Sequence, residues 1–110
     1  MRLKNLLLAA VFFTPALALA EPSQAQKDFV TYLVKSGKEP KVKDATWLTD
    51  SSLYVGVFDD GSRRDGFADY ICSVAGDHGV SPELVKVIDI VKLVRTGKFV
   101  GIGKSTCSQL

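Results

Sequence analysis

The stretch LYVGVFDDGSRRDGFADYICSVAGDHG, residues 53–79, decides the fold class of this chain. Its first six residues read as a strand with apolar side chains on both faces, which favours a central position in a sheet. Asp-Asp-Gly-Ser at residues 59–62 interrupts that pattern, and a helix is expected from 63 to 78 with Gly79 as its stop. A strand followed directly by a helix indicates a domain in which helices pack against a sheet.

The predicted helix over 63–78 is amphipathic. At 100° per residue, one face collects polar side chains and the other collects apolar ones together with the single histidine. Ser62 followed by Asp65 matches a loose form of the capping box at the start of this helix. The polar face holds Asp65, Asp69, Ser73 and Asp77, and the apolar face holds Phe67, Ala68, Ile71, Val74, Ala75 and His78.

Toward the N-terminus, residues 23–36 show helical spacing of apolar side chains, with Ser23 as N-cap and Gly37 at the expected C-terminal position. Residues 42–47 form a weak strand pattern, separated from the strand at 53–58 by a polar turn. These two strands are expected to make a hairpin. Trp47 and Tyr54 are both interpreted as core side chains.

Toward the C-terminus, residues 84–96 fit two readings. Ser81-Pro82 and Gly97 would cap a helix, whereas the β-branched run favours a strand over 84–90 that passes into a short helical turn before Gly97. We favour the strand. Residues 99–104 are expected to form a short edge strand.

Together these patterns predict a small α+β domain in which two helices pack on one face of an antiparallel or mixed sheet of about four strands. The expected order is helix, strand, strand, helix, strand, strand. No repeat or linker divides residues 21–110, so we expect one domain there.

The first twenty residues are expected to be a cleavable secretory signal peptide. A cationic start precedes the apolar run 6–13, and Ala18 and Ala20 supply small side chains for cleavage between Ala20 and Glu21. A membrane anchor is the alternative, but Pro15 interrupts the run well short of a spanning length. The mature chain is therefore expected in the periplasm or outside the cell, without insertion into a membrane.

The net charge of the chain changes when residues 1–20 are removed. The chain has 14 basic and 12 acidic residues, and loss of Arg2 and Lys4 with the signal leaves the two kinds equal. Nucleic-acid binding needs an excess of cations, so we expect no nucleic-acid partner. The charge is nevertheless uneven along the sequence, with a net −4 over residues 51–83 and a net +4 over residues 84–110.

Cys72 and Cys107 are the only cysteines, and in an exported chain they are expected to form one disulfide. They lie too far apart for a redox motif of the C-x-x-C type. With His78 they are also too few for a structural zinc site, and we expect neither metal nor cofactor.

The most distinctive candidate site is the loop that contains Asp59, Asp60, Arg63 and Arg64 and leads into the helix. Loops at strand-to-helix junctions commonly bind ligands, and Asp65 and Asp69 extend this site along the helix. The plainer interpretation is turn chemistry and helix capping, with a solvated acidic helix face. The loop does not have the spacing of a calcium-binding loop.

Two functions remain open on the sequence. The leading hypothesis is a non-enzymatic interaction module, acting on an exported or envelope protein as accessory or inhibitor, or associating with itself. The alternative is a small envelope hydrolase that uses carboxylates between Asp59 and Asp69 with His78 as acid or base. His78 is more simply explained as a partly buried imidazole near the helix C-terminus.

Overall fold

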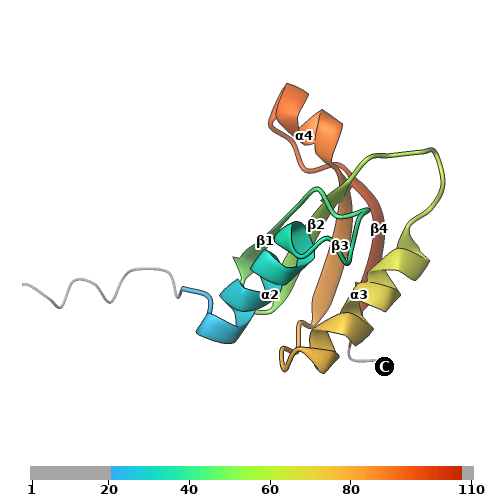
Figure 1. Ribbon diagram of the computed structural model, residues 1–110. Helices are drawn as coiled ribbons and strands as arrows, with labels where there is room; N and C mark the ends of the chain where they lie inside the picture. The colour runs from blue at the N-terminus through green and yellow to red at the C-terminus, as the bar shows by residue number, and fades with distance from the viewer. Residues whose placement is uncertain (1–20, 108–110) are drawn as a thin grey trace, which may run out of the picture.

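A mixed four-stranded sheet forms the centre of the computed structural model, which describes residues 21–107 (Figure 1). Its strands, in spatial order, are β1 (Asp44–Thr49), β2 (Ser52–Val57), β3 (Leu84–Asp89) and β4 (Gly101–Thr106). The two outer pairs are antiparallel, and the inner pair β2 and β3 is parallel. The hairpin, the central position of β2 and the edge position of the last strand are thereby confirmed.

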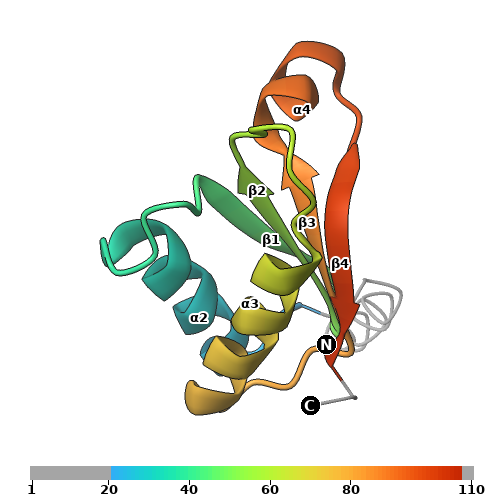
Figure 2. The same ribbon diagram turned by 90° about the vertical axis from the view of Figure 1, so that its right-hand side faces the viewer.

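Two helices, α2 (Gln24–Lys35) and α3 (Asp65–Asp77), cover one face of the sheet (Figure 2). Helix α2 lies against β1, and α3 lies against β3 and β4. A third helix, α4 (Ile90–Thr96), follows β3 and stands at one end of the sheet. The described part of the chain is thus a small α+β domain with three helices and a mixed sheet.

The core lies between the sheet and helices α2 and α3. Alternate residues of β2 and β3 point to this side, and each fully buried aliphatic side chain stabilises the fold by about 1.5–3 kcal/mol. The largest fully buried side chains are Phe29, Leu33, Leu53, Val55, Val57, Ile71, Val85 and Val87.

The predicted helix at 23–36 is confirmed together with its cap. The Ser23 hydroxyl accepts the backbone N–H of Gln26 at 3.1 Å, and the Gln26 side chain accepts the backbone N–H of Ser23 at 2.8 Å. Gly37, at the end of this helix, has a φ of +81°. These reciprocal bonds satisfy donors that a helix start leaves free, so the boundary follows from local sequence.

The segment after β3 is where the order of elements differs from the expected one. The strand and the helical turn are confirmed, but the turn is a complete helix, α4, between β3 and β4. Asp89 ends the strand because its carboxylate accepts the backbone N–H of Lys92 at 3.0 Å and caps the helix. Gly97, with a φ of +77°, ends α4. The alternative of a helix over the whole segment is wrong.

The starts of two elements differ from the predicted ones. Arg64, not Ser62, is the N-cap of α3, and its side chain makes no capping bond. Ser62 does not cap the helix, because its hydroxyl donates to Asp60. The first strand begins at Asp44, two residues later than expected, since Val42 is held in a turn by Glu39.

Tyr54 lies outside the core. Its strand neighbours Leu53 and Val55 occupy the helix-covered side, so Tyr54 points to the other side and packs edge-on against Phe99. Trp47 is half-buried under α2 and donates its indole N–H to the Gln26 carbonyl at 3.1 Å.

The predicted disulfide between Cys72 and Cys107 is present. It joins the middle of α3 to the residue that follows β4, so the end of the described chain is tied to the helical layer. The predicted signal peptide, residues 1–20, lies outside the described residues.

Candidate functional site

One end of the sheet gathers the loops that carry the unusual side chains. Parallel β2 and β3 finish at the same edge, and antiparallel β1 and β4 begin there. The segments at this edge are residues 40–43, 58–64 and 90–100, which we call the loop end (Figure 1). The carboxyl edge of parallel strands is a common position for binding sites.

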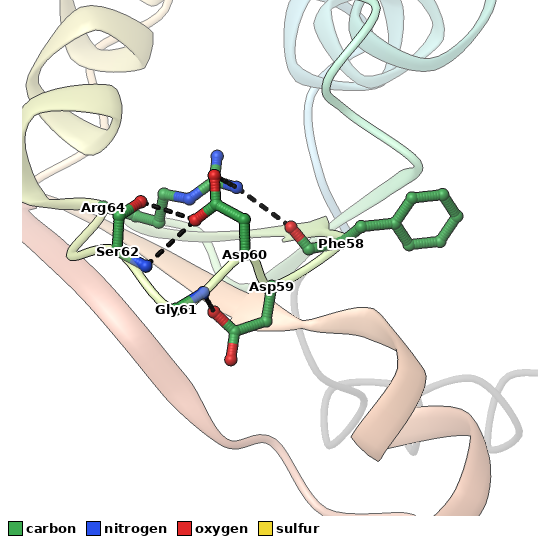
Figure 3. A network of polar contacts seen from close by, with 6 residues as sticks. All are labelled: Phe58, Asp59, Asp60, Gly61, Ser62 and Arg64. Atoms are coloured by element: carbon green, nitrogen blue, oxygen red, sulfur yellow. Dashed lines mark hydrogen bonds and ion pairs between the residues drawn. The ribbon is translucent and has the colours of Figure 1, made fainter.

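The loop over residues 58–64 is ordered by its own carboxylates (Figure 3). Asp59 accepts the backbone N–H of Gly61 at 2.9 Å, and Asp60 accepts both the backbone N–H and the hydroxyl of Ser62, at 2.9 and 2.6 Å. The Ser62 hydroxyl bond is the largest of the effects that lower the pKa of Asp60. These contacts are turn chemistry, as the plainer interpretation of the sequence holds.

Arg64 closes this loop from inside the protein. The residue is only 9% exposed, and its Nη2 atom donates to the Phe58 carbonyl at 2.9 Å and lies 3.4 Å from an Asp60 carboxylate oxygen. Its Nε atom is buried and has no hydrogen-bond partner among the described residues. The aromatic ring of Phe58 points away from this network toward solvent.

The start of α3 is bonded to the edge strand β4. The Arg64 backbone N–H donates to the Ile102 carbonyl at 3.0 Å, and Asp65 accepts the backbone N–H of Lys104 at 2.9 Å. One turn further along the helix, Asp69 accepts the hydroxyl of Ser105. These contacts occupy backbone groups that an edge strand otherwise offers to another chain.

The ion pairs of Asp60 and Asp65 both lie within the acidic half of the sequence, and neither joins it to the basic half. Asp65 also pairs with Arg63, whose Nη2 atom lies 2.7 Å from its carboxylate. The hydrogen bond from the Arg63 side chain is the largest cause of a lowered Asp65 pKa, followed by the bond from the Lys104 backbone. Two carboxylates that were expected on a solvated acidic face thus serve to hold α3 against β4.

This arrangement predicts a pH dependence of stability. The folded-state pKa of Asp65 is lower than the unfolded one, so its contribution is present above the unfolded pKa and is lost as the pH falls through the folded pKa. In Asp65→Asn, which keeps an acceptor but removes the charge, we expect lower stability at pH 7 and a difference from wild type that shrinks as the pH falls below 3.8, the ordinary pKa of an aspartate. Urea unfolding midpoints across this range measure it.

Asp77→Asn is the matched control, because Asp77 lies on the same helix and makes no hydrogen bond to β4 in the described part of the chain. A difference for Asp65→Asn that stays constant down to pH 2 contradicts the assignment.

His78 lies at the opposite end of α3 from the loop carboxylates. Its ring centroid is 4.1 Å from that of Tyr32 and 5.3 Å from that of Phe29. The 13 residues of α3 separate it from the start of the helix by about 20 Å. The structure therefore brings the candidate residues of the loop to one end of α3 and leaves His78 at the other. His78 is an exposed residue, and one side of its ring packs against Tyr32. The loop residues are Asp59, Asp60, Arg63, Arg64 and Asp65.

Exposed apolar side chains also concentrate at the loop end. Four of the six large hydrophobic side chains that the described residues expose lie there, and Val94 at 79% and Phe58 at 58% are the most exposed. The four are Phe58, Val91, Val94 and Phe99. The sequence did not predict the exposure of these side chains. A valine in a β-branched run is predicted to lie in the core unless the bounds of α4 are known.

The same end carries unpaired positive charge. Lys92, Arg95 and Lys98 on and after α4 form no ion pair with any described residue. Asp89, the last residue of β3 and the one acidic residue in the range 84–107, is buried as the cap of α4. The surface of α4 is thus cationic and apolar, and the 58–64 loop at the same end of the sheet carries exposed carboxylates.

The described residues were also compared with the requirements of a metal site and of a membrane-spanning helix. Within residues 21–107, no group of three or more His, Cys, Asp or Glu side chains has an arrangement that would hold a metal ion. No helix of that region has the length and apolar character needed to cross a membrane.

The fold and the site define a small mixed α+β domain with a charged and apolar loop end opposite its disulfide. Comparison with protein-family models, with curated proteins and with solved structures found no match.

Proposed function

We propose that this protein is exported with residues 1–20 removed, and that it is a non-enzymatic module that binds another protein through its loop end. The observation that carries the proposal is the exposure of four large apolar side chains, Phe58, Val91, Val94 and Phe99, at one end of the sheet. Apolar side chains gathered on a surface and surrounded by charge are typical of protein interaction sites. The disulfide is consistent with an oxidising compartment.

The charges at the loop end indicate what the partner offers. Lys92, Arg95 and Lys98 favour an acidic patch on the partner, while exposed Asp59 and Asp60 at the same end of the sheet favour a cation on it. A protein surface with both charges complements this pattern. An anionic bilayer would meet the same two carboxylates at close range and is the weaker fit.

The alternative of a small hydrolase has less support. Its acid–base scheme needs His78 near the loop carboxylates, and these groups stand at opposite ends of α3.

Site-specific photo-crosslinking tests the proposal. With a crosslinking side chain in place of Val94, we expect a discrete protein adduct in the exported fraction, and with one in place of Asp77, at the other end of the domain, we expect none. Raising the salt from about 0.05 M to 0.5 M shortens the Debye length and should lower the yield at position 94 at least fivefold.

Val94→Asp in the recovered protein should weaken binding of the identified partner about tenfold or more without lowering thermal stability, since Val94 is almost fully solvated. Equal adducts from positions 94 and 77, or a yield at position 94 that ignores salt, contradict the proposal. An adduct of twice the protein's own mass identifies a second copy as the partner instead.

A further inference from the structure

A cavity of about 220 Å³ opens at the loop end, between the segment before β1 and the start of the 58–64 loop. Pockets for drug-sized ligands occupy about 300–1,000 Å³, so this one suits an ion or a small acid. No Asp or Glu lines it. Its wall consists of three cations and three apolar side chains: Lys41, Lys43, Arg64, Pro40, Val57 and Phe58.

The lysines at this cavity are positioned by neutral groups. The Lys43 ammonium donates to the Pro40 carbonyl at 3.0 Å and lies 5.0 Å from the centroid of the Phe58 ring. The Lys41 ammonium lies 5.9 Å from the centroid of the Phe67 ring. Carbonyls and aromatic rings orient a cation without neutralising it, so the cavity keeps its positive charge.

Arg64 lines the same wall, and part of its guanidinium is buried. Its two polar contacts, to the Phe58 carbonyl and to Asp60, both use Nη2, and buried Nε has no acceptor in the described part of the chain. Native proteins rarely leave a buried charged donor unpaired, because its lost hydration is not replaced.

The two nearby carboxylates, of Asp60 and Glu39, do not accept a hydrogen bond from Nε of Arg64. Asp60 makes the ion pair with Arg64 at 3.4 Å, but its side chain is 65% exposed and its other oxygen is bonded to Ser62. Glu39 is buried and accepts the hydroxyl of Tyr70 at 2.7 Å, so it is directed toward α3 and does not line the cavity.

We propose that this cavity is a binding site for a small oxyanion, a carboxylate or a phosphate, held by the guanidinium of Arg64 and the ammonium groups of Lys41 and Lys43. A planar guanidinium matches the oxygens of either group, and two lysines supply the compensating charge. The site takes a free anion, so it does not depend on the protein partner proposed above.

NMR of the protein recovered after export tests this site, with the Arg64 Nε–H resonance as the probe. Inorganic phosphate and acetate are titrated separately, and chloride keeps the ionic strength constant. We expect a saturable shift of that resonance with at least one of the two ions. Saturation by phosphate alone assigns the site to phosphate groups, and saturation by acetate assigns it to carboxylates. A response no larger than that to chloride for both ions overturns the proposal.

Two lysine variants separate this site from general surface charge. Lys43→Gln should raise the dissociation constant about tenfold, as expected for one lost charge-assisted contact. Lys38→Gln removes an exposed lysine close by in sequence that does not line the cavity, and it should leave the constant unchanged. Equal weakening by both variants contradicts a localised site. Because Lys43 is exposed, its variant is expected to fold normally.

Discussion

Alanine in place of Gly103 should lower the free energy of unfolding by about 3 kcal/mol. A Cβ atom at this position of β4 would lie 2.3 Å from the Arg64 carbonyl carbon, 2.5 Å from its oxygen and 2.7 Å from the Asp65 nitrogen. All three are backbone atoms, so no side-chain rotation relieves the contact. Strand and helix must separate, which also strains the bonds from Arg64 to Ile102 and from Lys104 to Asp65.

Gly101→Ala is the matched control, two residues earlier on the same strand. Its Cβ would lie 2.6 Å from Cε of Lys86, the flexible end of a side chain that can move toward solvent. We expect a loss below about 1 kcal/mol there, against a fall in melting temperature of about 10–20 °C for Gly103→Ala. Thermal and urea unfolding of both variants measure the contrast. Equal effects would show that α3 and β4 are not in close contact at Gly103.

Removal of the disulfide should have an effect of similar size. Cys72 and Cys107 are 35 residues apart, and closing a loop of that length stabilises a folded chain by about 4 kcal/mol in the loop-entropy estimate. A small domain has a total stability of only about 5–15 kcal/mol. The Cys72→Ala/Cys107→Ala protein should therefore unfold at a much lower urea concentration than wild type.

Reductant supplies the control for this prediction. It should shift wild type toward the double variant and leave the double variant unchanged, since the sequence has no cysteine besides these two. Identical midpoints for the oxidised protein and the double variant would mean that the bond contributes nothing to stability.

The candidate site could be predicted only in part. The sequence pointed to Asp59, Asp60, Arg63 and Arg64 because their density between a strand and a helix is visible locally. The cavity was not predictable, because Lys41 and Lys43 join Arg64 only after the chain has returned through β1 and β2. Likewise, the separation of His78 from the loop depends on the length and direction of α3.

What the sequence alone determined is most of the helices and strands and several of their ends. Side-chain periodicity, the cap at Ser23 and the glycines at positions 37, 79 and 97 act over one or two helical turns, so they are readable without the fold. The pairing of Cys72 with Cys107 followed from their number.

Only the tertiary structure decided how those elements meet. The parallel pairing of β2 with β3 brings two distant loops to one edge, and the helix-covered face of the sheet leaves Tyr54 outside the core. The requirement for glycine at position 103 arises from the backbone of Arg64, 39 residues earlier, with no signal nearby in the sequence. The free energy that selects the strand partners and the covered face of the sheet comes from contacts between residues far apart in the chain. No short stretch of sequence shows those contacts.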